Sequence, residues 1–479
     1  MRDTFRKTAY AGLAAGAAGI ALLPALVFAV ARPAAPKASS LTVLFTNQAG
    51  GQIRSCNCTK FRYGGYGRQT TLVSSLRKSI PNLLVIEGGD FLGRPDSAQD
   101  KLKADVALKA FDIIKLAAVV PGEVELRFGR ESLASFQKTC KSAFVLANVR
   151  DKASGKQVCG KSYVAHKTAG GLKVAVVGLL GPKMLPKELP LGETDFKVTD
   201  HVAALKQVLP KARAAADVVI VVAHSTADEA RPLAQVKGVD VVICTHSDEK
   251  LVMPAKDANV VDMPAQRVGG CVLVNSGVRF GWSVGRLDLE LQQGKIKSHT
   301  SRLHYLDRAY DEDPKLVKLY DEYNKQVQEL TVKQEQQMRK QFDEILKKRG
   351  IDPTKSRRPK VFAGSAACKD CHQAAYDTWA KSRHAKAFAS LEKTKQEFDP
   401  ECVSCHVTGR MVRGGFANAK ETPELKDVQC EACHDPGAAH VAKPAAGYGA
   451  TGEEQCRSCH TEDYNPDWDY EQMWKEVAH

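Results

Sequence analysis

The sequence predicts an α/β layered domain, a long connecting helix after it, and then a separate cysteine-rich segment. Apolar β-branched runs alternate with helical patterns between residues 41 and 294, a Glu-, Lys-, Gln- and Leu-rich stretch runs from 311 to 348, and short cysteine motifs recur near the C-terminus. Alternating strands and helices are typical of layered α/β folds. We therefore divide the chain into 1–40, 41–294, 295–360 and 361–479. Below, the α/β part is called the front domain and residues 361–479 the C-terminal segment.

Local patterns predict each element of the front domain. The strands are short apolar runs rich in Val, Ile and Leu, which suits strands buried on both faces. The helices are longer runs with apolar residues at helical spacing. The expected strands are 41–45, 83–86, 174–177, 218–222 and 239–243, and the expected helices are 68–78, 104–116 and 202–216.

The connecting helix carries terminal signals. Pro314 lies near its start and Gly350 just past its end, where these residues favour the beginning and the end of a helix. Its apolar repeat is short, so we expect a packed or solvated connector rather than a coiled coil.

The first residues resemble an export signal. Arg2, Arg6 and Lys7 precede an apolar Ala/Gly-rich stretch, and this is the order of charge and apolar residues in a signal peptide. The stretch has about 22 residues, and roughly 20 span a bilayer, so a cleaved signal peptide and an N-terminal membrane anchor both remain open, followed by a linker. We expect the chain in the periplasm or on the outer face of the cytoplasmic membrane.

The net charge of +14 does not indicate a nucleic-acid partner. Lys and Arg are scattered along the chain rather than clustered, and no nucleic-acid-binding motif is present. Such a charge affects solubility and loose association rather than fold.

The cysteines give the sharpest signal. Eight of the fourteen fall in four Cys-x-x-Cys-His motifs, the pattern whose two thiols attach haem c and whose histidine binds the iron from one side. Four such motifs favour four covalent haems over a redox dithiol or half a zinc site. Because the motifs follow one another closely, the haems must form much of the interior. The attachment cysteines are Cys368, Cys371, Cys402, Cys405, Cys430, Cys433, Cys456 and Cys459, and the proximal histidines are His372, His406, His434 and His460.

The opposite axial ligands decide whether an iron conducts electrons or binds a small molecule. Three further histidines of this segment are the distal candidates, so four irons face three distal histidines. The fourth iron is open, or it takes a methionine or a histidine of the front domain. The distal candidates are His384, His440 and His479, and the alternatives for the fourth iron are Met411, Met473, His299 and His304.

Residues 360–479 resemble the tetrahaem cytochrome c-554 type domain. The resemblance rests on the runs from His384 to Phe388, from Pro400 to Gly409 and from Val428 to Gly437, and on the aromatic tail that ends in Trp474 and His479. It implies a mostly α-helical multihaem cytochrome c domain, with short helices around stacked haem pairs. It also implies bis-histidine haems with one five-coordinate haem, in agreement with the count of distal histidines.

Residues 41–292 resemble the metal-dependent phosphoesterase domain of the periplasmic 5'-nucleotidase family. Its motifs follow the expected strands, as Glu87-Gly-Gly-Asp90, the run from Pro121 to Gly129, Ala147-Asn148-Val149, Val222-Ala-His224 and Thr245-His246-Ser-Asp248. The resemblance implies a metallophosphoesterase-like β-sandwich flanked by helices.

The family's catalytic residues are partly lost. Gln48 and Gly50 stand where the family has two metal ligands, Val124 replaces the catalytic histidine, and Asp248 replaces the last histidine. Hydrolysis by two ions about 4 Å apart needs both sites, so we favour a retired enzyme fold kept for docking over a working hydrolase. One divalent transition metal could still be bound. The residues that could hold it are Asp90, Glu123, His224 and His246.

Six cysteines lie outside the haem motifs. Structural disulfides are plausible in an exported chain, and Cys140–Cys159 is the favoured pair. A thiolate site near Cys56 and Cys58 is the alternative. The other two are Cys244 and Cys271.

Two classes of function follow. We favour electron transfer by a tetrahaem cytochrome, with periplasmic or membrane redox proteins as donor and acceptor. The alternative is an enzyme, either one that acts on a small nitrogen or sulfur species at a five-coordinate haem or a residual mononuclear metal phosphoesterase.

Overall fold

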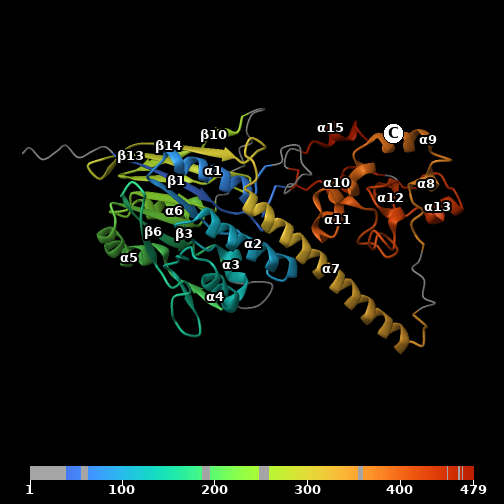
Figure 1. Cartoon of the computed structure of the whole chain (residues 1–479), viewed down its shortest axis with the longest axis horizontal. Coiled ribbons are helices and arrows are strands. Elements are labelled where there is room, and N and C mark those ends of the chain that lie inside the picture. Colours follow the sequence, from blue (N-terminus) through green and yellow to red (C-terminus); the bar gives the residue numbers. More distant parts are fainter. Residues whose placement is uncertain are drawn as a thin grey trace, which may run out of the picture. The chain divides into compact units, whose positions relative to one another are not determined.

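A β-sandwich forms the centre of the front domain in the computed structural model (Figure 1). The structure describes residues 39–55, 63–185, 195–246, 258–353, 360–449, 451–461, 464–465 and 468–479. The predicted export signal, Cys56, Cys58 and Asp248 lie outside these ranges. Among the described helices, none has the length and apolar character needed to cross a membrane.

Two six-stranded sheets make up the sandwich. The first has the order β10 (Val260–Asp262), β14 (Lys295–Tyr305), β13 (Ser283–Gln292), β1 (Ser39–Thr46), β2 (Leu83–Glu87) and β3 (Ala118–Val119). The second has the order β11 (Ala265–Val268), β12 (Cys271–Asn275), β9 (Val241–Cys244), β8 (Val218–His224), β6 (Lys173–Leu180) and β5 (Tyr163–Lys167). β4 (Val149–Asp151) and β7 (Phe196–Val198) form a small separate pair.

The strand β8 shows how the layers are held. All its residues are buried. Val218, Ile220 and Val222 pack into the apolar cluster shared with the first sheet, whereas Val219 and Val221 pack into a second cluster with α5 and α6. Because successive side chains of a strand point to opposite faces, one strand serves both layers. The helices are α1 (Tyr66–Ser79), α2 (Ala98–Ile114), α3 (Glu123–Arg127), α4 (Gly129–Thr139), α5 (His201–Ala215) and α6 (Ala227–Ala234).

The five predicted strands correspond to β1, β2, β6, β8 and β9, and the three predicted helices to α1, α2 and α5. The antiparallel pair β13 and β14 completes the first sheet. β14 lies in the part that the sequence assigned to the connector, so the sheet continues past the boundary predicted at 294. The reason is that β14 pairs with β10 as well as with β13.

A single long helix, α7 (Pro314–Lys348), follows the front domain. Its first turn is capped by Asp313, whose carboxylate accepts a hydrogen bond from the backbone N–H of Lys315 at 2.8 Å. Leu316, Tyr320 and Tyr323 are buried on one face, which packs against α1 and α2. The predicted connecting helix is therefore present and packed along its first half.

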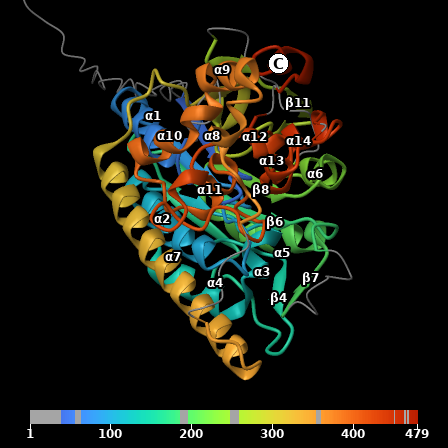
Figure 2. The same cartoon turned by 90° about the vertical axis from the view of Figure 1, so that its right-hand side faces the viewer.

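Short helices make up the C-terminal segment (Figure 2). Its buried apolar cluster is small. Most of the thiols and imidazoles of the haem motifs are partly exposed. The cluster consists of Phe362, Phe388, Leu391, Val403, Val407, Phe416 and Leu425. The helices are α8 (Ser365–Cys368), α9 (Gln373–Lys381), η1 (His384–Lys386), α10 (Ala387–Thr394), α11 (Pro400–His406), η2 (Pro423–Leu425), α12 (Cys430–Cys433), α13 (Ala438–Ala442), α14 (Glu453–Arg457) and α15 (Tyr470–Trp474). The described residues from 39 to 479 belong to one unit by their contacts.

Candidate functional site

Three pairs of histidine rings lie close together in the C-terminal segment, and each pair joins one motif histidine to one predicted distal histidine. Two imidazoles that hold one iron, at about 2.0 Å per metal–nitrogen bond, have their ring centroids about 6 Å apart. The three pairs fit this geometry closely. The centroid distances are 6.3 Å for His372–His440, 6.2 Å for His384–His460 and 5.5 Å for His434–His479.

The second motif differs from the other three. Within the described part of the chain, no histidine ring is paired with His406 in this way. Nδ1 of His406 lies 2.7 Å from the carbonyl oxygen of Ala387, which leaves Nε2 to face an iron. Met411 is 89% exposed, and His299 and His304 are held in β14 of the front sheet. Among the described residues, His406 therefore has no second histidine ring opposite it.

A hydrogen bond also orients the motif histidine His434. Nδ1 of His434 donates to the carbonyl oxygen of Gly449 at 2.5 Å, which leaves Nε2 free to bind a metal. Nδ1 of His460 instead lies 3.3 Å from the side-chain amide nitrogen of Asn465, which is a donor.

The motifs lie side by side in a defined order. The thiol of Cys368 lies beside that of Cys430, Cys433 lies close to Cys456, and Cys459 lies beside Cys405. These neighbours place the motifs in the spatial order first, third, fourth, second. Haem attached at one motif would therefore have a neighbouring motif close by.

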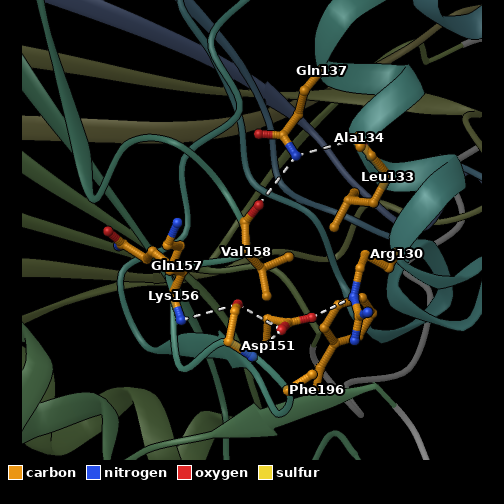
Figure 3. Close-up of a pocket in the computed structure, with 11 residues that line it drawn as sticks. Arg130, Leu133, Ala134, Gln137, Asp151, Lys156, Gln157, Val158 and Phe196 are labelled. Atoms are coloured by element: carbon orange, nitrogen blue, oxygen red, sulfur yellow. Dashed lines mark hydrogen bonds and ion pairs between the residues drawn. The ribbon is translucent and has the colours of Figure 1, made fainter.

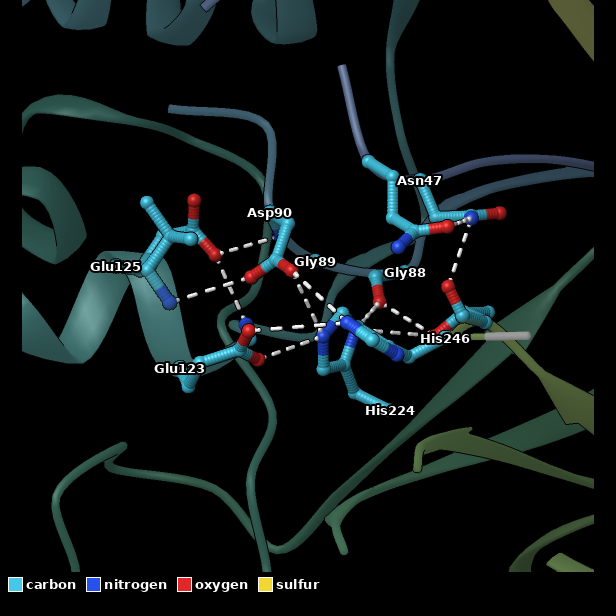
Figure 4. Close-up of polar contacts among 12 residues, drawn as sticks. Asn47, Gly88, Gly89, Asp90, Glu123, Glu125, His224 and His246 are labelled. Carbon is cyan, nitrogen blue, oxygen red and sulfur yellow. Dashed lines mark hydrogen bonds and ion pairs between the residues drawn. The ribbon is translucent and has the colours of Figure 1, made fainter. Parts of the chain in front are cut away.

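Four side chains converge in the front domain as the sequence predicted. Asp90, Glu123, His224 and His246 place one donor atom each within 4.8 Å of one another (Figure 4). Nε2 of His224 lies 3.2 Å from an oxygen of Asp90 and 3.0 Å from an oxygen of Glu123. Nε2 of His246 lies 4.0 Å from Asp90 and 3.8 Å from Glu123. Three of the four residues are buried.

The two sheets supply the four residues at the carboxyl ends of their strands. Asp90 follows β2 and Glu123 begins α3 after β3, whereas His224 ends β8 and His246 follows β9. Gly89 has φ +104°, and a Cβ there would lie 2.7 Å from Nδ1 of His224. Only glycine permits this close approach of the loop to the ring.

Nδ1 of His224 lies 2.8 Å from the carbonyl oxygen of Gly88, which directs Nε2 into the cluster. Burial disfavours ionisation of Asp90, but the neighbouring His224 outweighs it, so the pKa of Asp90 lies below its usual value. Burial likewise opposes the charged ring of His224, yet Asp90 and Glu123 raise the pKa of His224 well above its usual value. The cluster thus holds one positive charge between two carboxylates. A divalent cation could replace that proton.

Two oxygen and two nitrogen donors suit a divalent transition metal. The donors needed for a second ion are not assembled among the described residues, since Gln48 offers only an uncharged amide and Gly50 has no side chain. The four residues therefore fit a single ion.

Two buried carboxylates behind the cluster were not predicted. Glu125 accepts hydrogen bonds from the backbone N–H groups of Asp90 and Gly122, both at 2.8 Å, and so ties the two loops together. Glu87 accepts from those of Gly88 and Gly89. Burial raises the pKa of Glu125 to about 8 and that of Glu87 to about 7. The Gly-x-x-Glu spacing of a capping box could have indicated Glu125.

The favoured disulfide is wrong. Cys140 and Cys159 are both buried and form no disulfide, and neither do Cys244 and Cys271, which are also buried. The thiol of Cys140 lies 3.5 Å from a carboxylate oxygen of Asp112 on α2 instead. The helix α4 thus directs Cys140 toward α2 rather than toward Cys159.

A pocket of about 420 Å³ lies between α4, β4 and β7 (Figure 3). Arg130 and Asp151 form an ion pair of 2.5 Å in its wall. None of the four converging residues and none of the haem motifs line it. It is therefore separate from both candidate sites.

Residues 367–435 match the family model described as cytochrome c554 and c-prime. Cytochrome c-554 of Nitrosomonas europaea is 36% identical over 70 residues, which are 12% of this chain and 30% of that protein. Human 5'-nucleotidase is 28% identical over 310 residues, 60% of this chain and 53% of that protein. The chain joins a 5'-nucleotidase-like domain to a cytochrome c554-like segment. Both resemblances seen in the sequence are thereby confirmed.

The solved structures agree on the fold of the 5'-nucleotidase-like domain. The 5'-nucleotidase precursor from Thermus thermophilus has a TM-score of 0.51 at 20% identity and covers 60% of this chain and 59% of its own. The calcineurin-like phosphoesterase YfkN from Bacillus subtilis has a TM-score of 0.50 at 20% identity and covers 60% of this chain and 98% of its own. The front domain thus has a metallophosphoesterase-like fold. The chain spans about half the length of the curated 5'-nucleotidases that it matches.

Proposed function

We propose that the chain is an exported tetrahaem c-type cytochrome that transfers electrons. The proposal rests on one observation above all, namely that three of the four haem motifs have a second histidine at the distance that one iron between two rings requires. Bound haem supplies a reversible one-electron iron couple. The histidines hold the irons, and the closely spaced motifs keep the haems near one another.

The residues of the C-terminal segment supply what electron transfer needs. An iron held by two histidines changes charge without changing ligands, so the protein reorganises little. Its redox partners are periplasmic or membrane redox proteins, at the periplasm or on the outer face of the cytoplasmic membrane. The apolar, basic-flanked N-terminus supports this location.

A second function is favoured by His406. An iron held only by His406 would have an open position, where a small nitrogen or sulfur species could bind and be oxidised or reduced. The fourth motif is the neighbour of the second, because its Cys459 lies beside Cys405. The neighbouring haems would deliver or remove the electrons.

In this proposal the front domain has lost nucleotide hydrolysis and serves to dock and orient the cytochrome. A single divalent transition metal is held by Asp90, Glu123, His224 and His246, and it stabilises the loops that carry them. The absence of a histidine at Val124 removes the group that the related enzymes would use in catalysis.

Mass spectrometry of the mature, exported protein tests the proposal. We expect a mass gain of four haems and full, reversible reduction of all four in an electrochemical titration. Three or fewer haems after complete maturation, or haems that cannot be reoxidised, would contradict it.

A further inference from the structure

The helix α11, which carries the second haem motif, is anchored to the front domain by buried polar contacts. Nε2 of Gln99 on α2 donates hydrogen bonds to a carboxylate oxygen of Asp399 at 2.7 Å and to the hydroxyl of Tyr323 at 2.9 Å. Nζ of Lys103, one turn further along α2, lies 2.6 Å from a carboxylate oxygen of Glu401. Gln99 and Asp399 are each 6% exposed. These contacts join residues about 300 positions apart in the chain.

The anchored residues are those that begin α11. Asp399 is the N-cap of this helix and accepts a hydrogen bond from the backbone N–H of Glu401 at 3.0 Å. Cys402, Cys405 and His406 follow within the same helix. Because a short helix moves as one body, fixing its first turn fixes the two thiols and the proximal histidine.

The same contacts place charges beside the second motif. Four charged side chains interact electrostatically with Cys402, namely Asp399, Arg54, Glu401 and Lys103. The side chain of Lys103 is only 12% exposed, so solvent screens its charge weakly. Two ion pairs between α7 and the C-terminal segment, Lys395–Asp321 and Arg339–Glu421, are more exposed, and such pairs contribute little.

We propose that Gln99 and Lys103 are positioning residues for the second haem, and that the charges of Lys103 and Glu401 shift its reduction potential in opposite directions. This inference rests on the proposed function, since it presumes that haem is attached at Cys402 and Cys405. According to this inference, the front domain contacts and orients the second haem motif, whose histidine is the one that lacks a paired ring among the described residues.

The sign of each charge effect follows from the iron. Ferric iron carries one more positive charge than ferrous iron, so a nearby cation favours the reduced state and raises the reduction potential, whereas a nearby anion lowers it. Lys103→Met should therefore lower the potential of the second haem and Glu401→Gln should raise it. The double variant should return most of the way to the original value, because the two charges cancel.

The test is a redox titration of the full-length, haem-loaded protein, with each haem followed by its optical and paramagnetic signals. The second haem is assigned by the spectral change that His406→Met causes. Lys109→Met is the matched control, because Lys109 lies on the same helix and pairs with Asp105 at 2.6 Å on the exposed surface. We expect no shift in this control. Lys103→Arg keeps the charge and should keep the potential, even if Lys103→Met loads haem poorly.

The inference is overturned if Lys103→Met and Glu401→Gln shift the potential in the same direction, or if all four haems shift equally. Loss of thermal stability without opposite shifts would leave only a structural role and also overturn it. The proposed function fails separately, if fewer than four haems are attached. Gln99→Met, which removes the hydrogen bond without changing charge, should broaden the signal of the second haem while leaving the other three unchanged.

Discussion

The rings of His384 and His460 lie with their centroids 6.2 Å apart and inclined by 65°, although His384 follows the first haem motif and His460 belongs to the fourth. The other two pairs also join histidines of different motifs. Each of these three haems would thus connect distant parts of the C-terminal segment. Since the apolar cluster there is small, haem attachment should be needed for the segment to fold.

Replacing a distal histidine should open one further iron. In His384→Ala the iron held by His460 loses its second strong ligand and should become high-spin, so the high-spin signal should grow from one haem to two. Added imidazole should reverse the change. His166→Ala, an exposed histidine on β5, is the control and should leave the spectrum as it was. An unchanged spectrum in His384→Ala would show that His384 is not a ligand.

The front domain should bind one divalent metal ion and lose it when a donor is removed. Glu123→Gln takes away one carboxylate, and we expect the affinity for Zn²⁺ or Mn²⁺ to fall by at least about tenfold. Elemental analysis after dialysis against a chelator-treated buffer measures this. Glu131→Gln, which changes an exposed glutamate of α4, should keep the metal. Equal metal content in the two variants would argue against the site.

Nucleotide hydrolysis should be absent, or any residual activity should not depend on the four clustered residues of the front domain. A second metal ion is not expected, because Gln48 and Gly50 offer no charged ligand. Val124, which replaces the catalytic histidine, cannot transfer a proton. We expect any release of phosphate from AMP to be unchanged by Asp90→Ala and His224→Ala. Turnover that both substitutions abolish would mean that the domain remains an enzyme.

His304 should make the front domain less stable in acid. Burial and the neighbouring Arg286 lower the pKa of His304 to about 4. The unfolded chain, with a pKa of about 6.5, therefore binds more protons than the folded one between these values, so stability should rise with pH across this window, by at most about 3 kcal/mol. Thermal unfolding followed by circular dichroism from pH 4.5 to 7 should show a weaker pH dependence in His304→Gln than in the original protein. An equal dependence in both would contradict this assignment.

Local spacing explains which features the sequence revealed. The haem attachment sites are contiguous motifs. Asp90, His224 and His246 each lie at or just after the end of a predicted strand, and Glu123 lies in the run from Pro121 to Gly129, so both sets could be named. The pairing of His372 with His440 could not, because it depends on how separate motifs pack. The contact of Gln99 with Asp399 and the role of Glu125 behind Asp90 were missed for the same reason, since each depends on a partner that only the folded chain brings close. The boundary after residue 294 shifted because β14 reveals its place only through its pairing with β13.

Low-temperature electron paramagnetic resonance of the fully oxidised protein tests the central claim most directly. Three irons held by paired histidines should give low-spin ferric signals, and the iron at His406 should give one high-spin signal. Nitric oxide, added to the reduced protein, should bind at that one haem. Four low-spin haems, or more than one high-spin haem in the unsubstituted protein, would contradict the account.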